Sequence, residues 1–170
     1  MTLVLKKISK SGISEAFQKV ELYRYLNEPE EAESICRDIL EIEPENQLAL
    51  RLLGLTLTDQ FIGARTDRYG EVEAAFKSLK DPYERLYYTG LLYERRAKAQ
   101  LRLDDYLPHT LLPLFEEAMR CFAEAEKIRP AGNDDAILRW NRCVRLLQSR
   151  PDFEWEKASS TFEAHDSPPV

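Results

Sequence analysis

The chain has 170 residues, of which 44% are hydrophobic and 10% aromatic, and its formal net charge is -6. This composition supplies enough apolar surface for one packed domain and excludes a chain that is disordered throughout. Acidic and basic residues are intermixed, without the basic stripe that a nucleic-acid site requires, so we expect no nucleic-acid binding.

Three cysteines, Cys36, Cys121 and Cys143, are an odd number and form no CxxC pair. Each lies in an apolar helical pattern, which predicts buried, reduced thiols and a reducing compartment. The first ten residues contain only three consecutive apolar residues before two lysines. No later run approaches the roughly 18 apolar residues of a membrane span. We therefore predict a cytoplasmic protein without membrane insertion.

Apolar residues at spacings of three and four predict three helices in the first half of the chain, after a loosely held lead-in at 1–12. The predicted helices cover residues 13–26, from Pro29 to about Glu43, and 47–60. Asn27, followed by Pro29 in the first turn and Glu30 as a capping-box partner, predicts that Asn27 caps the second helix.

The second half of the chain continues the helical pattern. A short helix is predicted at 71–79, and a long one from Pro82 to about Leu103, with Asp81 as its cap and Glu84 completing a capping box. Thr110 is the predicted cap of the next helix, which ends before Pro130. A last amphipathic helix at 134–149 precedes a polar tail.

Small residues and prolines recur at a regular distance, with Gly54 and Gly90 lying 36 residues apart. This pattern resembles the tetratricopeptide repeat family, in which Leu-Gly and Tyr mark a first helix, and Ala, Phe and Pro a second. The matching residues are Leu50-Leu53-Gly54-Leu57 and Leu86-Thr89-Gly90-Tyr93 for first helices, and Ala32-Cys36-Ile39-Pro44 and Ala118-Phe122-Ala125-Pro130 for second helices. Glycine and alanine at these positions allow helix axes to approach closely.

The resemblance covers about four fifths of the chain and implies an all-α fold, a right-handed superhelix of antiparallel helix pairs. It implies a helical domain at 13–149, with repeats at 13–46, 47–82 and 83–132 and a capping helix at 134–149, followed by the tail at 150–170. The third repeat departs from the pattern through an insertion of about 16 residues between its two helices. We expect the insertion to lengthen mostly the first helix, which would protrude beyond the stack.

The tip of this extended helix is apolar and has two interpretations. It folds back on its own domain, or it is exposed and forms a homodimer contact. The tip residues are Leu101, Leu103, Tyr106 and Leu107.

In the family, first helices line a concave groove, which implies a partner-binding surface here. The groove candidates are Phe17, Glu21, Arg24, Tyr25, Arg51, Leu55, Tyr87, Tyr88, Leu91, Arg95, Asn141 and Arg145. Tyrosine and arginine are frequent hot-spot residues at interfaces, although Tyr87 and Tyr88 fit a core role equally well. The terminal-carboxylate clamp of co-chaperone relatives is absent, since its positions hold Phe17, Glu21, Leu52, Glu84 and Tyr88. Apolar and aromatic contacts, with polarity from Glu21 and Arg51, are therefore expected to hold the partner.

Catalysis finds no support, because His109 and His165 lack companions and no nucleophile, phosphate-binding or metal-ligand spacing occurs. Acidic runs such as 28–33 are interpreted as solvated helix faces. We predict a non-catalytic module, with no cofactor and no metal, that binds a segment of another protein. The alternatives are a secretion-type chaperone that holds a translocator segment and a self-assembling structural subunit. A further hypothesis is that Trp155 and its neighbours in the tail occupy the groove.

Overall fold

The computed structural model describes residues 3–62, 68–103 and 107–150. Regular structure in these ranges consists of a short 3-10 helix, η1 (Lys10–Gly12), and seven α-helices, which confirms the all-α prediction. The helices are α1 (Ile13–Tyr25), α2 (Pro29–Ile42), α3 (Gln47–Asp59), α4 (Tyr69–Lys77), α5 (Pro82–Leu101), α6 (Pro108–Lys127) and α7 (Asp135–Gln148). None of the helices described is both long and apolar enough to cross a bilayer.

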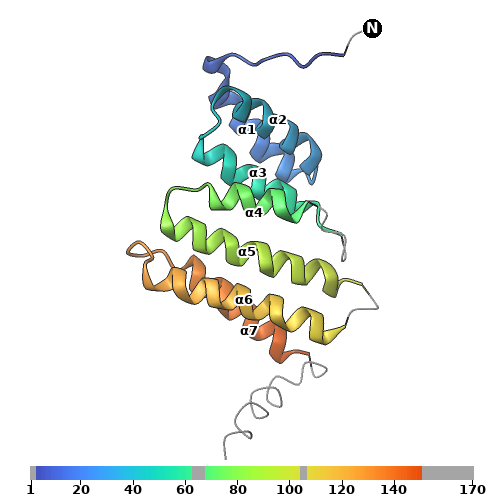
Figure 1. Ribbon diagram of the computed structural model, residues 1–170, viewed down its shortest axis with the longest axis vertical. Helices are drawn as coiled ribbons and strands as arrows, with labels where there is room; N and C mark the ends of the chain where they lie inside the picture. The colour runs from blue at the N-terminus through green and yellow to red at the C-terminus, as the bar shows by residue number, and fades with distance from the viewer. Residues whose placement is uncertain (1–2, 63–67, 104–106, 151–170) are drawn as a thin grey trace, which may run out of the picture.

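The helices stack as successive layers along the long axis of the molecule, from α1 and α2 at one end to α6 and α7 at the other (Figure 1). Each helix packs against the next one in the chain, and α1, α3, α5 and α7 also contact one another in that order. The odd-numbered helices therefore form a continuous face of the array. Side chains from distant parts of the sequence meet on this face.

Two glycines set the spacing within the second and third helix pairs. A Cβ atom on Gly54 of α3 would lie 2.2 Å from Cε1 of Phe76 in α4, and one on Gly90 of α5 would lie 2.8 Å from Cε1 of Phe122 in α6. No real Cβ atom tolerates such distances, so both aromatic rings occupy the space that a side chain would need. This confirms the prediction that both glycines allow a neighbouring helix to approach.

The first helix pair has no glycine at the equivalent position. Gly54 and Phe76 are each the eighth residue of their helices, and Val20 and Cys36 are the eighth residues of α1 and α2. Both Val20 and Cys36 are fully buried in the same core cluster. A medium-sized pair thus takes the place of the glycine and phenylalanine of the second pair.

The third helix pair is the longest, and its extension differs from the prediction. Both α5 and α6 have 20 residues, whereas α3 has 13 and α4 has 9. The extra turns of α5 do not protrude alone, because α6 already begins at Pro108 and its buried Leu111 and Phe115 pack in one cluster with Ala97 of α5. The expectation that the first helix takes most of the insertion was wrong. Pro108 does not delay the second helix but occupies its first turn, where proline is tolerated, so α6 takes a comparable share.

Only some of the predicted helix caps occur. Asp81 accepts a hydrogen bond of 2.7 Å from the backbone N–H of Tyr83, which confirms it as the cap of α5. Asn27 has a positive φ of 60° and lies in the turn after α1, so the prediction that it caps α2 was wrong. Asparagine tolerates this left-handed conformation better than most residues. Thr110 lies inside α6, whose N-cap position is Leu107.

An ionic cluster joins α2 to the start of α4. Arg68, at the N-cap of α4, donates two hydrogen bonds of 2.7 and 2.6 Å to the two carboxylate oxygens of Glu33, and Gln60 donates another of 2.8 Å. Arg37 and Glu71 complete the cluster. The hydrogen bonds from Arg68 lower the pKa of Glu33 to about 2, against the effect of burial. Glu33 is therefore part of a structural network, which corrects its interpretation as part of a solvated face.

Polar contacts between helices recur at a nearly constant separation in the sequence. The partners Arg24 and Asp59 are 35 residues apart, as are Glu45 and Lys80, while Asp59 and Arg95 are 36 apart. Each contact thus joins one helix to the helix two positions later, or the loops that precede such helices. The chain advances along the array by about the same step each time.

Candidate functional site

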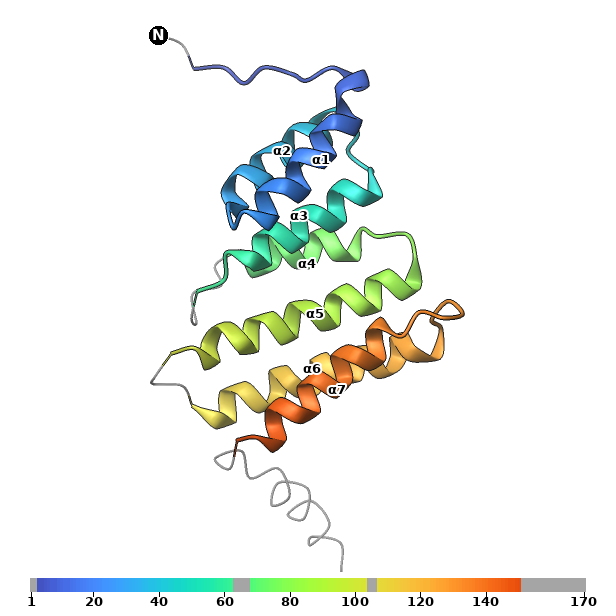
Figure 2. The same ribbon diagram turned by 180° about the vertical axis from the view of Figure 1, so that it is seen from behind.

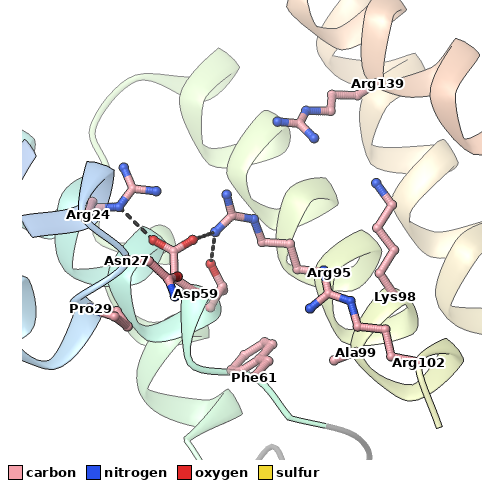
Figure 3. A pocket seen from close by; sticks show the side chains of 11 residues that line it. Arg24, Asn27, Pro29, Asp59, Phe61, Arg95, Lys98, Ala99, Arg102 and Arg139 are labelled. Carbon is pink, nitrogen blue, oxygen red and sulfur yellow. Dashed lines mark hydrogen bonds and ion pairs between the residues drawn. The ribbon is translucent and has the colours of Figure 1, made fainter.

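A cavity of about 430 Å³ opens on the face formed by the odd-numbered helices (Figure 3). Its charged lining comes from all four of these helices and comprises Arg24, Asp59, Arg95, Lys98, Arg102 and Arg139. Asn27, Pro29, Thr58, Phe61 and Ala99 complete the lining. Arg24 lies in the last turn of α1, Asp59 is the last residue of α3, and Arg102 is the C-cap of α5. The cavity therefore lies where three helices end.

Asp59 receives arginine side chains from two different helices. Arg24 donates from Nε to one carboxylate oxygen at 2.7 Å, and Arg95 donates from Nη1 to the other. Arg95 also donates to Oγ1 of Thr58 at 2.6 Å and to the carbonyl of Leu55 at 3.2 Å. Figure 3 shows both guanidinium groups directed at the same carboxylate. These contacts hold α1, α3 and α5 together at the edge of the cavity.

The electrostatic surroundings of Arg95 are unfavourable to its charge. Desolvation by burial lowers the pKa of its guanidinium, and the positive charges of Arg24 and Arg139 lower it further, although Asp59 acts in the opposite direction. A lowered arginine pKa remains far above neutrality, so Arg95 stays charged. Its charge is thus only partly compensated by Asp59.

The opposite wall of the cavity is organised by a buried carboxylate. Glu94 of α5 has no exposed surface, and it forms ion pairs with Lys98 one turn later and with Arg139 of α7, whose Nη1 lies 3.5 Å from Oε2. Burial opposes the charge of Arg139, but a hydrogen bond with Tyr87 and the field of Glu94 outweigh it and raise the pKa of Arg139. Glu94 therefore positions two cations that line the cavity without lining it itself.

The balance of charge in the described part of the site is positive. Five cations line the cavity, and the carboxylates of Asp59 and Glu94 leave an excess of three positive charges. The three helix C-termini contribute about half a negative charge each. The excess is reduced by about half and is not cancelled. Arg102 is exposed and has no ionic partner among the residues that the structure describes. The cavity is therefore suited to an anionic group.

The structure brings two of the predicted groove residues together in this cavity, Arg24 and Arg95. Arg51 instead forms an ion pair of 2.5 Å with Glu84. Tyr88 packs on Phe76 and Tyr87 on Phe122, so both tyrosines contribute to the core, although neither is fully buried. Leu91 is only 2% exposed, and its side chain is not available to a partner.

The remaining predicted residues lie elsewhere. Phe17 and Leu55 are half-buried against the core, Asn141 is half-buried, and Glu21, Tyr25 and Arg145 are exposed, with Tyr25 at 88%. Of the predicted tip residues, Leu101 packs against the core, whereas Leu103 and Leu107 are 42% and 53% exposed. Tyr106 and Trp155 lie outside the described residues, as does the tail after residue 150.

The sequence analysis missed Lys98, Arg102 and Arg139 as site residues. A signal for the first two was present, because Arg95, Lys98 and Arg102 follow one another at spacings of three and four and so share a stripe of α5. Arg139 had no such signal. It lies 44 residues beyond Arg95 and reaches the site only because α7 packs on α5.

The three cysteines are buried and do not line the cavity. Cys36, Cys121 and Cys143 are free and buried, and desolvation raises the pKa of all three thiols. Among the described residues there is no group of three or more His, Cys, Asp or Glu side chains that could hold a metal ion. Thiolate chemistry is disfavoured by burial, because a reactive cysteine needs an accessible thiolate.

Comparison of the chain with protein-family models, with curated proteins and with solved structures gives no match.

Proposed function

We propose that this chain is a non-catalytic interaction module that binds an acidic segment of another protein in the cavity between α1, α3, α5 and α7. One observation carries the proposal: cations from α1, α5 and α7 converge on an open cavity with an excess of positive charge. The positive excess stands out because the net charge of the whole chain is -6. Complementary charge favours both the encounter with an acidic segment and its orientation.

A tetratricopeptide-like solenoid is the architecture that we propose for the helix pairs. Its support is the close contact at Gly54 and Gly90 and the separation of 33 to 36 residues between several polar partners on neighbouring pairs. The family has a repeat length of about 34 residues. In such an array, the helices that we find around the cavity line the binding groove. The buried thiols favour a reducing compartment such as the cytoplasm.

The expected partner chemistry differs from the one that the sequence suggested. Tyr87, Tyr88 and Leu91 are engaged in packing, so aromatic and aliphatic anchors are scarce around the cavity. Among the described residues of the lining, Phe61 is the only large apolar side chain. Charge-assisted hydrogen bonds from guanidinium groups to carboxylates are the contacts that the lining offers. Nucleic acid is the less suitable polyanion, since it needs a basic surface that follows several phosphates.

The proposal is tested by the affinity of the full chain for a fluorescein-labelled deca-glutamate peptide, measured by fluorescence anisotropy at low and moderate salt. Arg102→Glu and its control are made in a chain whose five acidic residues after 150 are replaced by the corresponding amides, so that no acidic segment of the same chain competes with the peptide. In this chain we expect Arg102→Glu to weaken binding roughly tenfold, because it reverses a charge at the cavity. Arg142→Glu is the matched control, since Arg142 is exposed on α7 and does not line the cavity. It changes the net charge equally and should leave the affinity within about a factor of two. Equal effects of Arg102→Glu and Arg142→Glu, or no binding of the peptide by the parent chain with the amide replacements, would contradict the proposal.

A further inference from the structure

The direction of α7 determines where the chain goes after the cavity. Arg139 of α7 forms an ion pair with Glu94 of α5. Four residues later in each helix, Lys98 of α5 is close enough to Cys143 of α7 for its charge to lower the pKa of the thiol. The two helices therefore run in the same direction, as Figure 2 also shows. α7 ends at Gln148, on the side of the molecule where α5 ends next to Arg102. Residue 150 therefore lies on the side of the molecule where α5 ends and where the cavity opens.

The sequence that follows is complementary in charge to the cavity. Residues 151–170 contain five acidic side chains, one lysine, Lys157, and one histidine, His165. The acids are Asp152, Glu154, Glu156, Glu163 and Asp166. Three of them alternate with Phe153 and Trp155, so an extended chain would direct carboxylates to one side and aromatic rings to the other. These carboxylates could supply the negative counter-charge that the excess cations of the cavity lack.

The distances allow contact between the two. Arg150 lies eleven residues after Arg139, about 16 Å along the axis of α7. Twenty residues span up to about 66 Å when extended. The segment 151–170 is therefore long enough to reach the lining cations from the end of α7. Because it is covalently attached, its binding would be intramolecular.

We propose that residues 151–170 bind in the cation-lined cavity of the same chain and compete there with the acidic segment of a partner. This inference rests on the proposed function, because it assigns a regulator to the same site. A tethered segment experiences an effective concentration on the order of 1 mM. A tail that as a free peptide binds with a Kd of about 0.1 mM would then occupy the cavity about nine tenths of the time. It would weaken partner binding roughly tenfold.

The test uses the full chain in two forms with equal net charge. In the tail-neutral form the five tail carboxylates become amides, by Asp152→Asn, Glu154→Gln, Glu156→Gln, Glu163→Gln and Asp166→Asn. In the surface-neutral form five exposed carboxylates on α2 and α6 are changed, by Glu30→Gln, Glu31→Gln, Glu41→Gln, Glu116→Gln and Glu126→Gln. We expect the tail-neutral form to bind labelled deca-glutamate roughly tenfold more tightly than the unmodified chain, and the surface-neutral form to change by less than about threefold.

A second measurement reports on the tail itself. In a Trp140→Phe background Trp155 is the only tryptophan, and we expect acrylamide to quench it several-fold more efficiently in the tail-neutral form than in the chain with an unmodified tail. Arg102→Glu in the cavity should produce the same exposure of Trp155. Equal peptide affinities for the tail-neutral and surface-neutral forms, with equal quenching, would overturn the role of the tail and leave the proposed function intact. Failure of every form to bind the peptide would overturn the proposed function and this inference together.

Discussion

Gly54 and Phe76 are in such close contact that a single methyl group at residue 54 would overlap the aromatic ring. Phe76 is fully buried, so the ring has little room to move. We expect Gly54→Ala to lower the free energy of unfolding by about 1–2 kcal/mol, because overpacking costs about 1–3 kcal/mol and alanine regains at most about 1 kcal/mol of helix propensity. Gly90→Ala should act in the same direction.

The matched control for both glycine variants is Gly70→Ala. Gly70 is the second residue of α4, and a Cβ atom there would meet no atom within 4 Å. Alanine should raise the free energy of unfolding by up to about 1 kcal/mol at this position, because it restricts the unfolded chain without a clash. Urea denaturation followed by circular dichroism measures all three changes. Stabilisation by Gly54→Ala would show that α3 and α4 are not in close contact.

The sequence was informative where the physics is local. Helix bounds followed from apolar spacing and from prolines, and the two glycines could be recognised because a glycine inside a helix needs a packing reason. Caps were less certain, since Asn27 fits both a helix start and a left-handed turn, and only the path of the chain distinguishes them. The division of the insertion between α5 and α6 was not predicted, because Pro108 fits both the end of a helix and the first turn of the next one.

The ionic contacts, both in the α2–α4 cluster and in the candidate site, were harder to predict because they are not local. In the α2–α4 cluster, Glu33 and Arg68 are 35 residues apart, and each lies among other charged residues of the sequence. Arg24 and Arg95 were expected in a groove, but nothing in the sequence shows that Asp59 lies between them. Charges at the equivalent point of successive helix pairs meet only once the helices are stacked.

The pairing of Glu33 with Arg68 predicts a dependence of stability on pH. The folded-state pKa of Glu33 is lowered from 4.5 to about 2. Its stabilising effect is therefore complete above the unfolded-state value and is lost as the pH falls towards 2. We expect Glu33→Gln to lower the free energy of unfolding at pH 7 by about 1 to 2 kcal/mol, with allowance for screening by solvent. The difference from the unmodified protein should shrink at pH 2.5, as measured by urea titration.

Glu45→Gln is the control for this pH effect. Glu45 also pairs with a cation, Lys80, but both side chains are largely exposed, so we expect no measurable loss of stability. A loss for Glu33→Gln that is as large at pH 2.5 as at pH 7 would show that the carboxylate charge is not what stabilises the cluster.

Glu94 is predicted to be the most sensitive charged residue of the candidate site. Its replacement by glutamine leaves Lys98 and Arg139 without their buried counter-charge, and breaking a buried ion pair costs about 3–5 kcal/mol. Because both cations are partly exposed, we expect a loss of about 2–3 kcal/mol. Glu124→Gln, which breaks an exposed pair with Lys127, should cost less than about 1 kcal/mol. Thermal and urea unfolding of the two variants would distinguish a buried ionic pair from a surface one.

The three thiols should be unreactive in the folded protein. Burial raises the pKa of Cys36 and Cys143 to about 12, and raises that of Cys121 as well. At pH 8 we expect negligible reaction with Ellman's reagent within minutes, and rapid release of three equivalents per chain in guanidinium chloride. Fast stoichiometric reaction of a native thiol would show that its helix opens readily.

Because the helix pairs differ in length, we expect local stability to differ along the long axis of the molecule. The 20-residue helices α5 and α6 share a large cluster with α7, whereas α1 and α2 lie at the end of the stack. Amide protons should therefore exchange most slowly in α5 and α6, and fraying should begin at α1. Such an opening would remove Arg24 from the cavity and leave Arg95, Lys98 and Arg139 in place. The cavity would lose the charge of Arg24 while the helices that carry its other cations stayed folded. A ligand that bridges α1 and α5 would therefore also slow amide exchange in α1, the helix that we expect to open first.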